Sequence, residues 1–427
     1  MNQDTGPAIK AKPQSTAHAQ AKNDGSTLLL ALAGVVGLFQ MVTHVVPFGK
    51  GFEMVAIAQN LAQHGTYGNP YGVLDTGPTA ANPPLYPFLL AIAFRLLHSF
   101  DLAAFAATAA NIIANAITAI LLPHVSMLFY RDKRPGFVAA ILWIFACPLV
   151  PDWDVEFTVL TILIFCLFTS ATMAKSRSSL TAITAGLLAS ALFLFNPSTL
   201  LIFGPWILWL AFERRKAFTQ ALAYCSIAFA VLLIAVSMWG FRNKQQLGAF
   251  VIRTNLGSTL YASNNDCAKP SLKESEMNHC HDDHHPNTSI EEARLVISLG
   301  EVRYDRLRTA DAKAWMRTHP SAFLRLTLAR IRDFWFPVPW DSRFESAVIW
   351  LATLLSVPGL VIMARRRDRT LPFVIATLLI YPFMYYMIIS DVRYRLPVLW
   401  ISLLAAGTFV VSIWDRARRQ PQLRDAA

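Results

Sequence analysis

The chain has 427 residues, of which 54% are hydrophobic and only 15% are charged. Soluble domains carry about 25% charged residues, so most of this surface must face something other than water. The formal net charge of +11 arises from short Lys and Arg clusters beside apolar runs, a pattern typical of membrane topology signals. No nucleic-acid-binding motif accompanies that charge. We therefore expect an all-α membrane protein that contacts a lipid bilayer and no nucleic acid.

Residues 1–25 are polar and contain no apolar run, which predicts a disordered cytoplasmic tail rather than a signal peptide. The long apolar runs that follow exclude a barrel and predict about ten transmembrane helices. The predicted spans are 27–46, 103–130, 136–150, 157–174, 180–195, 199–212, 218–240, 344–363, 370–389 and 396–413. The boundaries at 136–150 and 180–212 stay open because those segments are short.

Five basic clusters flank the predicted spans. They are Arg131, Lys133 and Arg134; Lys175 and Arg177; Arg214, Arg215 and Lys216; Arg365, Arg366, Arg367 and Arg369; and Arg416, Arg418 and Arg419. Because short loops rich in Lys and Arg stay in the cytoplasm, ten spans place both termini there. The predicted units are a membrane domain at 26–240, C-terminal membrane helices at 344–414 and a tail at 415–427. Two external segments result, at 47–102 and 241–343.

The external segments contain three expected helices besides the short one at Glu53 described below. Residues 84–98 are too short to span and are predicted to lie in the outer interface. Ser289 followed by Glu292 is a capping-box pattern that predicts a helix through about Met316, within a small helical unit. Residues 321–334 form a basic amphipathic stretch that we expect on the outer membrane surface.

Glu53 is the only carboxylate between the first predicted span and Asp75. Apolar residues follow it at helical spacing, which predicts a short helix with Glu53 in its first turn. A carboxylate at the mouth of the membrane can accept a proton from an acceptor hydroxyl or amine. The alternative is an acid that only stabilises the start of a helix.

Arg393 and Arg395 lie in a short external loop, where the topology rule disfavours positive charge. Arginine makes forked hydrogen bonds with phosphate, so this pair could hold a lipid phosphate. A structural pair with Asp391 or an ordinary head-group contact is the alternative. Arg242, at the same depth, could join the phosphate site.

Two further groups are candidates for lining a substrate site. Asp152 and Asp154 lie on a short external turn and could bind a sugar or a cation, although acids on outer loops are usually only solvated. Tyr67 and Tyr86 could stack on sugar rings or belong to an interfacial aromatic belt.

The stretch NHCHDDHHPN at 278–287 has a composition that can bind Zn or Cu, but its spacing matches no standard site. Cys267 and Cys280 lie in one polar loop on the oxidising side, so we favour a disulfide between them. That bond would leave the histidines as a solvated polar turn. We assign no metal ligand and no firm cofactor, and a divalent metal stays open.

Four motifs now stand in order along the chain. They are Glu53 with IAQNLAQHG, then GPTAANPPLYPFLLAIAFRLLH, then FRNKQQLGAFVIRTNLGSTLYASNN, then RYRLPV. Together they resemble the polytopic glycosyltransferases of the C superfamily. The chain looks most like the bacterial dolichyl-phosphate-mannose protein mannosyltransferase type, which is similar to the lipid A aminoarabinose transferase. The resemblance covers nearly the whole chain beyond the tail.

The resemblance implies a polyprenyl-phosphate sugar donor, a lipid, glycan or protein acceptor, and inversion at the anomeric carbon. By position, Glu53 matches the catalytic acid of the first external loop, Arg393 and Arg395 match the basic tyrosine motif, and Arg242 matches an Arg-Asn pair. The family members favour a bacterial plasma membrane with the active site facing the periplasm or exterior. Many members carry two adjacent acids in the first loop, whereas here Phe52 precedes Glu53. That departure bears on the strength of the base and on any metal held by the pair.

Two other functions compete with this interpretation. One is a flippase or transporter of lipid-linked sugars, which would show charges deep in several spans and repeated halves. Neither feature is evident in the sequence. The other is a polymerase of lipid-linked oligosaccharides, which would share the outer-face site and differ in its acceptor.

Overall fold

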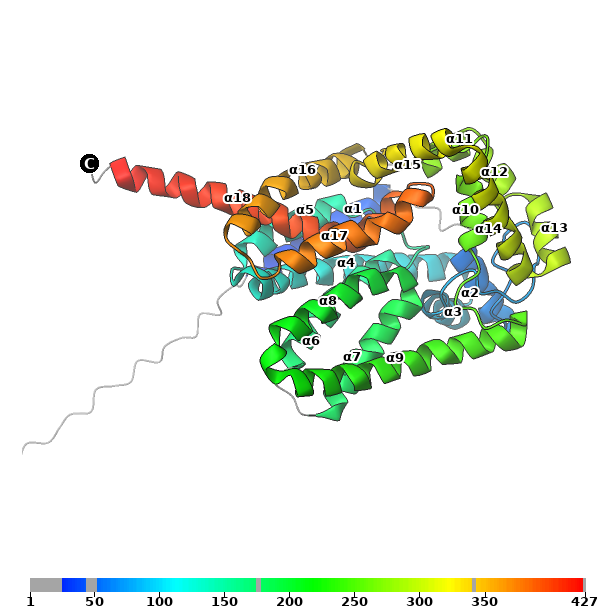
Figure 1. The fold of residues 1–427 in the computed structure, drawn as a ribbon, viewed down its shortest axis with the longest axis horizontal. Helices are drawn as coiled ribbons and strands as arrows, with labels where there is room; N and C mark the ends of the chain where they lie inside the picture. Colours follow the sequence, from blue (N-terminus) through cyan, green and yellow to red (C-terminus); the bar gives the residue numbers. More distant parts are fainter. Residues whose placement is uncertain (1–24, 44–51, 174–177, 340–342, 425–427) are drawn as a thin grey trace, which may run out of the picture.

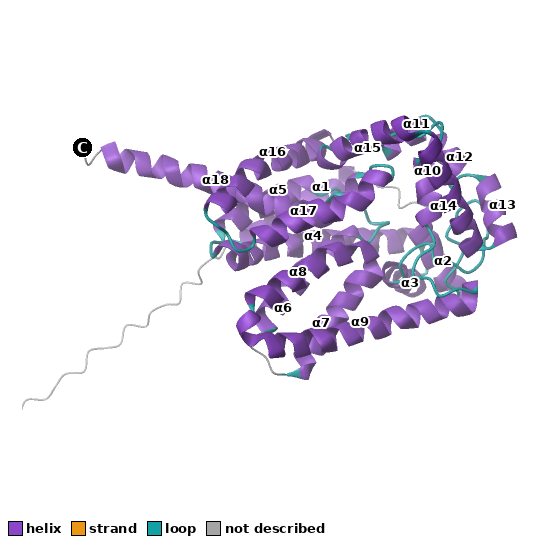
Figure 2. Cartoon of the chain, viewed as in Figure 1, coloured by secondary structure: helices purple, strands orange, loops and turns teal. Residues whose placement is uncertain are grey.

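The computed structural model describes residues 25–43, 52–173, 178–339 and 343–424. This part of the chain is helical, with two isolated β-bridges and no strand (Figures 1 and 2). The predicted tail before Gly25 and the basic cluster of Lys175 and Arg177 lie outside the described residues. The all-α prediction is therefore confirmed for the described part of the chain.

Ten helices correspond to the ten predicted spans. They are α1 (Ser26–Thr43), α4 (Phe100–Tyr130), α5 (Arg134–Ala146), α6 (Val155–Thr172), α7 (Ser179–Phe195), α8 (Leu200–Glu213), α9 (Phe218–Leu247), α16 (Arg343–Arg365), α17 (Leu371–Phe383) and α18 (Leu396–Arg424). Five of them, α4, α6, α9, α16 and α18, are long and apolar enough to cross a membrane. The fold is thus consistent with a membrane protein, and the number of spans remains a prediction.

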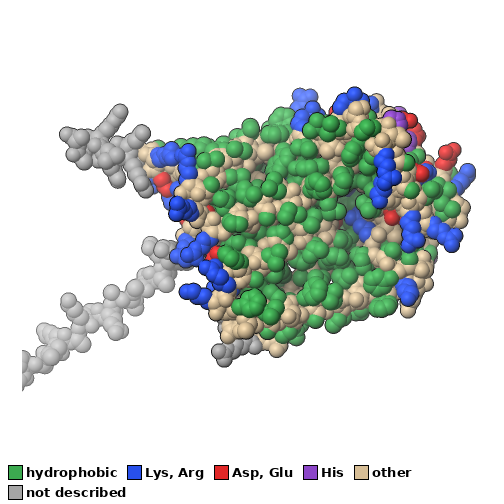
Figure 3. Space-filling model, in the orientation of Figure 1, with side chains coloured by type: hydrophobic (Ala, Val, Ile, Leu, Met, Phe, Trp, Pro, Cys, Tyr) green, Lys and Arg blue, Asp and Glu red, His purple; other side chains and the backbone are tan. Residues whose placement is uncertain are grey.

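The helix ends that follow or precede the basic clusters meet at one end of the bundle. Arg134 at the start of α5 binds Asp415 of α18 at 2.7 Å, and Arg369 before α17 lies 3.5 Å from Glu213 at the end of α8. Trp209 of α8 also donates to the backbone carbonyl of Arg369. Figure 3 shows the corresponding gathering of Lys and Arg beside a broad band of hydrophobic side chains. The predicted topology requires this arrangement, because it places every loop that carries a basic cluster on the same side of the membrane.

The centre of the bundle depends on close helix contacts and large buried aromatics. Trp143, Trp206 and Trp400 are fully buried. Gly359 lets α16 approach α18 so closely that a Cβ at this position would lie 1.9 Å from the carbonyl oxygen of Ala405. Small residues at such crossings allow helix backbones to pack directly in lipid.

The remaining α-helices lie toward the opposite end (Figure 1). They are α2 (Glu53–His64), α3 (Leu85–Leu97), α10 (Leu256–Ser263), α11 (Leu272–Met277), α12 (Cys280–His284), α13 (Ile290–Leu299), α14 (Glu301–Thr318) and α15 (Pro320–Trp335). Short 3-10 turns η1 (Pro197–Thr199), η3 (Met384–Met387) and η4 (Val392–Tyr394) connect the long helices at this end. The helices predicted at 84–98 and 321–334 correspond to α3 and α15.

The helix expected from Ser289 through Met316 is wrong in one respect. Ser289 does cap α13 by accepting the amide of Glu292, as the capping-box pattern predicts. Gly300, however, adopts φ 78° and ψ 148°, which ends α13 and redirects the chain into α14. Glu301 then accepts the backbone amide of Ala80, so the break brings a buried acid onto the first loop.

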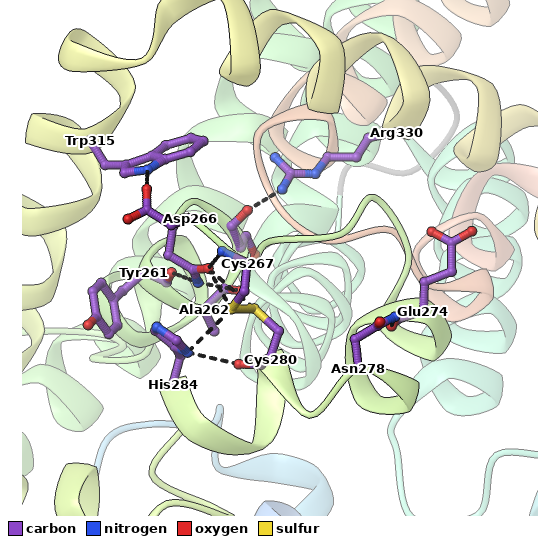
Figure 4. Close-up of a disulfide and its surroundings, with 12 residues drawn as sticks. Tyr261, Ala262, Asp266, Cys267, Glu274, Asn278, Cys280, His284, Trp315 and Arg330 are labelled. Atoms are coloured by element: carbon purple, nitrogen blue, oxygen red, sulfur yellow. Dashed lines mark hydrogen bonds between the residues drawn. A yellow bond between two sulfur atoms is a disulfide. The ribbon is translucent and has the colours of Figure 1, made fainter.

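Cys267 and Cys280 form a disulfide with a Cα–Cα distance of 5.7 Å (Figure 4). The bond joins the loop between α10 and α11 to the first residue of α12. Nearby, Trp315 of α14 donates its indole N–H to Asp266 at 2.7 Å. The helices α10 to α15, here called the external unit, are therefore held by a covalent link and by a side-chain bond from α14.

Replacing Gly359 by Ala should lower the free energy of unfolding by about 3 kcal/mol, because the new methyl group meets backbone rather than a movable side chain. Thermal unfolding in detergent measures this loss. Gly34→Ala in α1 is the matched control, since no atom lies within 4 Å of a Cβ there. Equal melting temperatures for the two variants would contradict the close approach of α16 and α18.

Replacing Cys267 and Cys280 together by Ser should destabilise the external unit by about 3 kcal/mol, because the bond closes a loop between residues 13 apart. Limited proteolysis of purified protein should then cut residues 264–290 faster than in the wild type. Cys225→Ser, which removes a free thiol of α9, should leave the cutting rate unchanged. Cleavage of the double variant at the wild-type rate would argue against this contribution.

Candidate active site

A cavity of about 670 Å³ lies between the ends of the long helices and the external unit. The starts of α6 and α18, the ends of α7 and α17, and parts of α2, α10 and α12 contribute to its wall. Because α17 runs to the cavity from Arg369 and α18 runs from it toward Asp415, the cavity lies opposite the basic end of the bundle.

The long helices contribute different chemistry to this wall from the short helices and the loops. Phe193 and Phe195 of α7 and Tyr381 of α17, followed by Met384 and Ile388, are largely apolar. The short helices α2, α11 and α12 and the loops contribute charged and polar groups. These are Glu53, Asp154, Arg253, Glu276, His281, Asp282, His285 and Arg393. One cavity thus offers apolar surface together with both signs of charge.

Glu53 is the first residue of α2 and is only 7% exposed. One carboxylate oxygen accepts the amide N–H of Asn82 at 2.7 Å, and the other lies 3.4 Å from Nε2 of His285. Asn82 is held in turn, since its carbonyl accepts the hydroxyl of Tyr67 at 3.0 Å. The first external loop therefore folds back onto the acid that the sequence singles out.

The expectation that the histidines form a solvated turn is wrong for His281 and His285, whereas His279 is exposed. His281 and His285 line the cavity, and His285 is only 8% exposed. Their rings stack at 4.8 Å, and the ring of Tyr71 packs edge-on against His285. Burial lowers the pKa of His285 to about 4 and that of His281 to about 3, with Arg393 adding to the effect at His285. Both imidazoles are neutral at pH 7.

Arg393 is the one predicted phosphate-binding arginine that lines the cavity. Its guanidinium stacks on Trp153 at 3.7 Å, and its Nε lies 3.4 Å from Asp391. Arg253 lines the same cavity and donates to the carbonyl of Ala81 at 2.9 Å. The sequence analysis missed Arg253, because it lies in a long external segment where the topology rule does not make a positive charge unusual.

Arg242 and Arg395 do not line the cavity. Arg242 donates to the carbonyls of Thr79 and Tyr67 at 2.6 Å each and ties the end of α9 to the first loop. Arg395 is fully buried, donates to Ser402 at 2.7 Å and packs against the ring of Trp335 at 4.4 Å. Burial lowers the pKa of Arg395 to about 9. The three arginines expected at one phosphate thus occupy three different places.

The remaining predicted residues are buried, and only Asp154 lines the cavity. It begins α6, accepts the hydroxyl of Thr158 at 2.7 Å, and has its pKa raised by burial. Asp152 is 7% exposed, and burial raises its pKa to about 6. Tyr86 donates to the carbonyl of Pro151, whereas Tyr67 holds Asn82. Both tyrosines therefore support the wall of the site from behind.

Arg330 of α15 connects the external unit to the segment that precedes Arg393. It is fully buried and donates to the carbonyl of Ser263, to Asn264 and, at 3.1 Å, to the carbonyl of Met387. Asn264 donates to the same carbonyl at 3.0 Å. This cation fixes two stretches of the cavity wall against each other.

The described residues contain a single group of three potential metal ligands whose donor atoms lie within 4.8 Å of one another. It consists of Cys267, Cys280 and His284. The disulfide occupies both sulfurs, and metal binding requires thiolate. In its oxidised form this group does not fit a metal ion.

No family model and no curated protein sequence matches the chain. Two solved structures overlap with nearly all of it. The oligosaccharyltransferase AglB from Archaeoglobus fulgidus, in complex with an inhibitory peptide and a dolichol-phosphate, matches with a TM-score of 0.53 and 12% identity over 94% of this chain and 52% of its own. An Archaeoglobus fulgidus oligosaccharyltransferase in complex with Zn and sulfate matches with a TM-score of 0.51 and 10% identity over 91% and 49%.

ArnT from Cupriavidus metallidurans, bound to undecaprenyl phosphate, overlaps with a TM-score of 0.37 and 10% identity over 91% of this chain and 78% of its own. The chain spans about half the length of the two oligosaccharyltransferase chains. Only those two TM-scores exceed 0.5. The chain therefore shares the fold of about half of an oligosaccharyltransferase.

Proposed function

We propose that this chain is an inverting glycosyltransferase that moves a sugar from a polyprenyl-phosphate donor to an acceptor on the non-cytoplasmic face of the membrane. The observation that carries the proposal is the single cavity that contains buried Glu53, the two arginines Arg253 and Arg393, and apolar helix ends. The dolichol-phosphate bound by AglB supports the donor class.

The chemistry of the wall suits a lipid-linked donor. The apolar side chains from α7 and α17 would contact the isoprenoid chain, and Arg393 with Arg253 would bind its phosphate. Arginine favours this role because its planar fork forms charge-assisted hydrogen bonds with phosphate oxygens. Stacking on Trp153 keeps the guanidinium of Arg393 in place without neutralising it.

Each bond change in the reaction has a residue beside it. The acceptor oxygen or nitrogen attacks the anomeric carbon while Glu53 takes its proton. The bond between that carbon and the phosphate oxygen breaks, and the lipid phosphate leaves with the electron pair. Arg393 and Arg253 stabilise the negative charge that gathers on the phosphate. Attack opposite the leaving group inverts the anomeric configuration.

The proposal includes a location. Ten spans with both termini in the cytoplasm would direct the cavity to the outer side of a bacterial inner membrane, because the basic clusters lie at the other end of the bundle. The external segments at 47–102 and 241–343 would then cover the site. The acceptor would be a lipid, a glycan or a protein.

Glu53→Gln should lower transfer of labelled sugar from polyprenyl-phosphate sugars by about 10³-fold, because an amide cannot accept the proton. The measurement uses membranes that contain each variant and a panel of donors. Glu291→Gln, an exposed glutamate at the start of α13, is the control and should transfer normally. Undiminished transfer by Glu53→Gln would rule out this base. Absence of transfer from every donor, with labelled lipid still crossing the bilayer, would support the flippase instead.

Arg393→Met should raise the KM for the donor about 30-fold, because one or two charge-assisted hydrogen bonds to phosphate are lost. Initial rates at varied donor concentration measure this change. Arg294→Met removes an exposed arginine of α13 and should leave the KM unaltered. If the KM for the donor stays at the wild-type value in Arg393→Met, the phosphate is bound elsewhere.

A further inference from the structure

Each oxygen of the Glu53 carboxylate has an uncharged side chain beside it. Asn82 donates to Oε2 at 2.7 Å, and Nε2 of His285 lies 3.4 Å from Oε1. Asn82 is fully buried, and Glu53 and His285 are less than 10% exposed. The plane of the carboxylate is therefore defined by two partners that are far apart in the sequence. One lies in the first loop and the other follows α12.

The tautomer of His285 follows from its other nitrogen. The backbone N–H of Asn287 donates to Nδ1 of His285 at 3.2 Å, so Nδ1 must present its lone pair. A neutral imidazole then carries its proton on Nε2, which is the atom that faces Glu53. The low pKa of about 4 that burial gives His285 agrees with this neutral form.

The backbone around His285 is fixed from several directions. Its carbonyl accepts the amides of Thr288 at 3.1 Å and Ser289 at 2.9 Å. His281 stacks on the ring from α12, whose first residue, Cys280, is joined to Cys267 by the disulfide. The imidazole is thus preorganised before any substrate arrives.

This donor set differs from one that binds a metal. A histidine that ligates a cation through Nε2 must offer a lone pair there and usually donates its Nδ1–H to an acceptor. His285 shows the reverse arrangement, since Nδ1 accepts and Nε2 carries the proton. Within the described residues, moreover, the one group of three clustered ligand atoms excludes Glu53.

We propose that His285 is a positioning residue that orients the Glu53 carboxylate through its Nε2–H, so that this base works without a divalent cation as its partner. The inference rests on the glycosyl transfer proposed above and specifies how the base is organised. The oxygen lone pairs that Asn82 and His285 leave free remain available for the acceptor proton.

The kinetic test compares two substitutions of His285 in the full-length chain. His285→Ala should lower kcat about 100-fold through misplacement of the base, with the KM for the donor unchanged. His285→Gln should stay within about 10-fold of the wild type, because its amide N–H can replace the Nε2–H. His279→Asn is the control on the same loop, since His279 is 82% exposed and has a positive φ that Asn tolerates.

Treatment with EDTA followed by gel filtration should leave wild-type transfer unchanged, and added Mn²⁺, Mg²⁺ or Zn²⁺ should not raise it. Loss of transfer that one of these ions restores would overturn the proposal. A folded His285→Gln protein as inactive as His285→Ala would also overturn it.

A spectroscopic measurement separates this proposal from the activity itself. In ¹⁵N-histidine-labelled protein, the resonance pair that disappears in His285→Gln should report the Nε2–H tautomer, whether or not any donor is turned over. A protonated Nδ1 would refute the role of His285 even in an active enzyme. Correct tautomer without transfer from any donor would instead refute the glycosyltransferase assignment, and with it the role given to His285.

Discussion

The buried guanidinium of Arg330 is the contact on which the arrangement of the site depends. A cation without solvent requires several acceptors, and those that Arg330 meets among the described residues come from two distant stretches, at Ser263 and Asn264 and at Met387. Satisfying it forces the end of α10 against the turn that leads into the last long helix. Ile389 donates to the hydroxyl of Ser263 within the same contact. The external unit and the helix bundle consequently form one continuous wall of the cavity.

The other arginines at this end of the bundle also differ in what their charges contact. Arg242 and Arg395 contact backbone carbonyls, a hydroxyl and aromatic rings, so their charges support the architecture around the cavity. Arg393 and Arg253 keep surface toward the cavity. Positive charge around the cavity therefore has two uses in this chain. Positions that hold loops lie behind the wall, and positions that face a ligand lie in it.

Much of the fold could be predicted from the sequence because it is encoded locally. The apolar runs, the cap at Ser289 and the short helix that begins at Glu53 depend on neighbours only a few residues away. The break at Gly300 was missed, although a glycine after a helical run is a common stop signal, because the helix pattern resumes directly after it at Glu301. The roles of His285 and Arg395 depend on partners far along the chain or in other helices, as His285 and Glu53 are separated by more than two hundred positions. Local patterns cannot reveal such pairs, and they also cannot distinguish a buried histidine from a solvated one.

The position of the disulfide links the site to the compartment in which the chain matures. Cys280 is the first residue of α12, and the helix carries His281 and leads directly into His285 beside Glu53. A chain whose two thiols are still reduced lacks the covalent anchor of that helix. Disulfides form outside the reducing cytosol, so in the proposed topology the surroundings of Glu53 would become complete only after this loop has crossed the membrane. Export of the loop would then also be the step that completes the cavity wall beside Glu53.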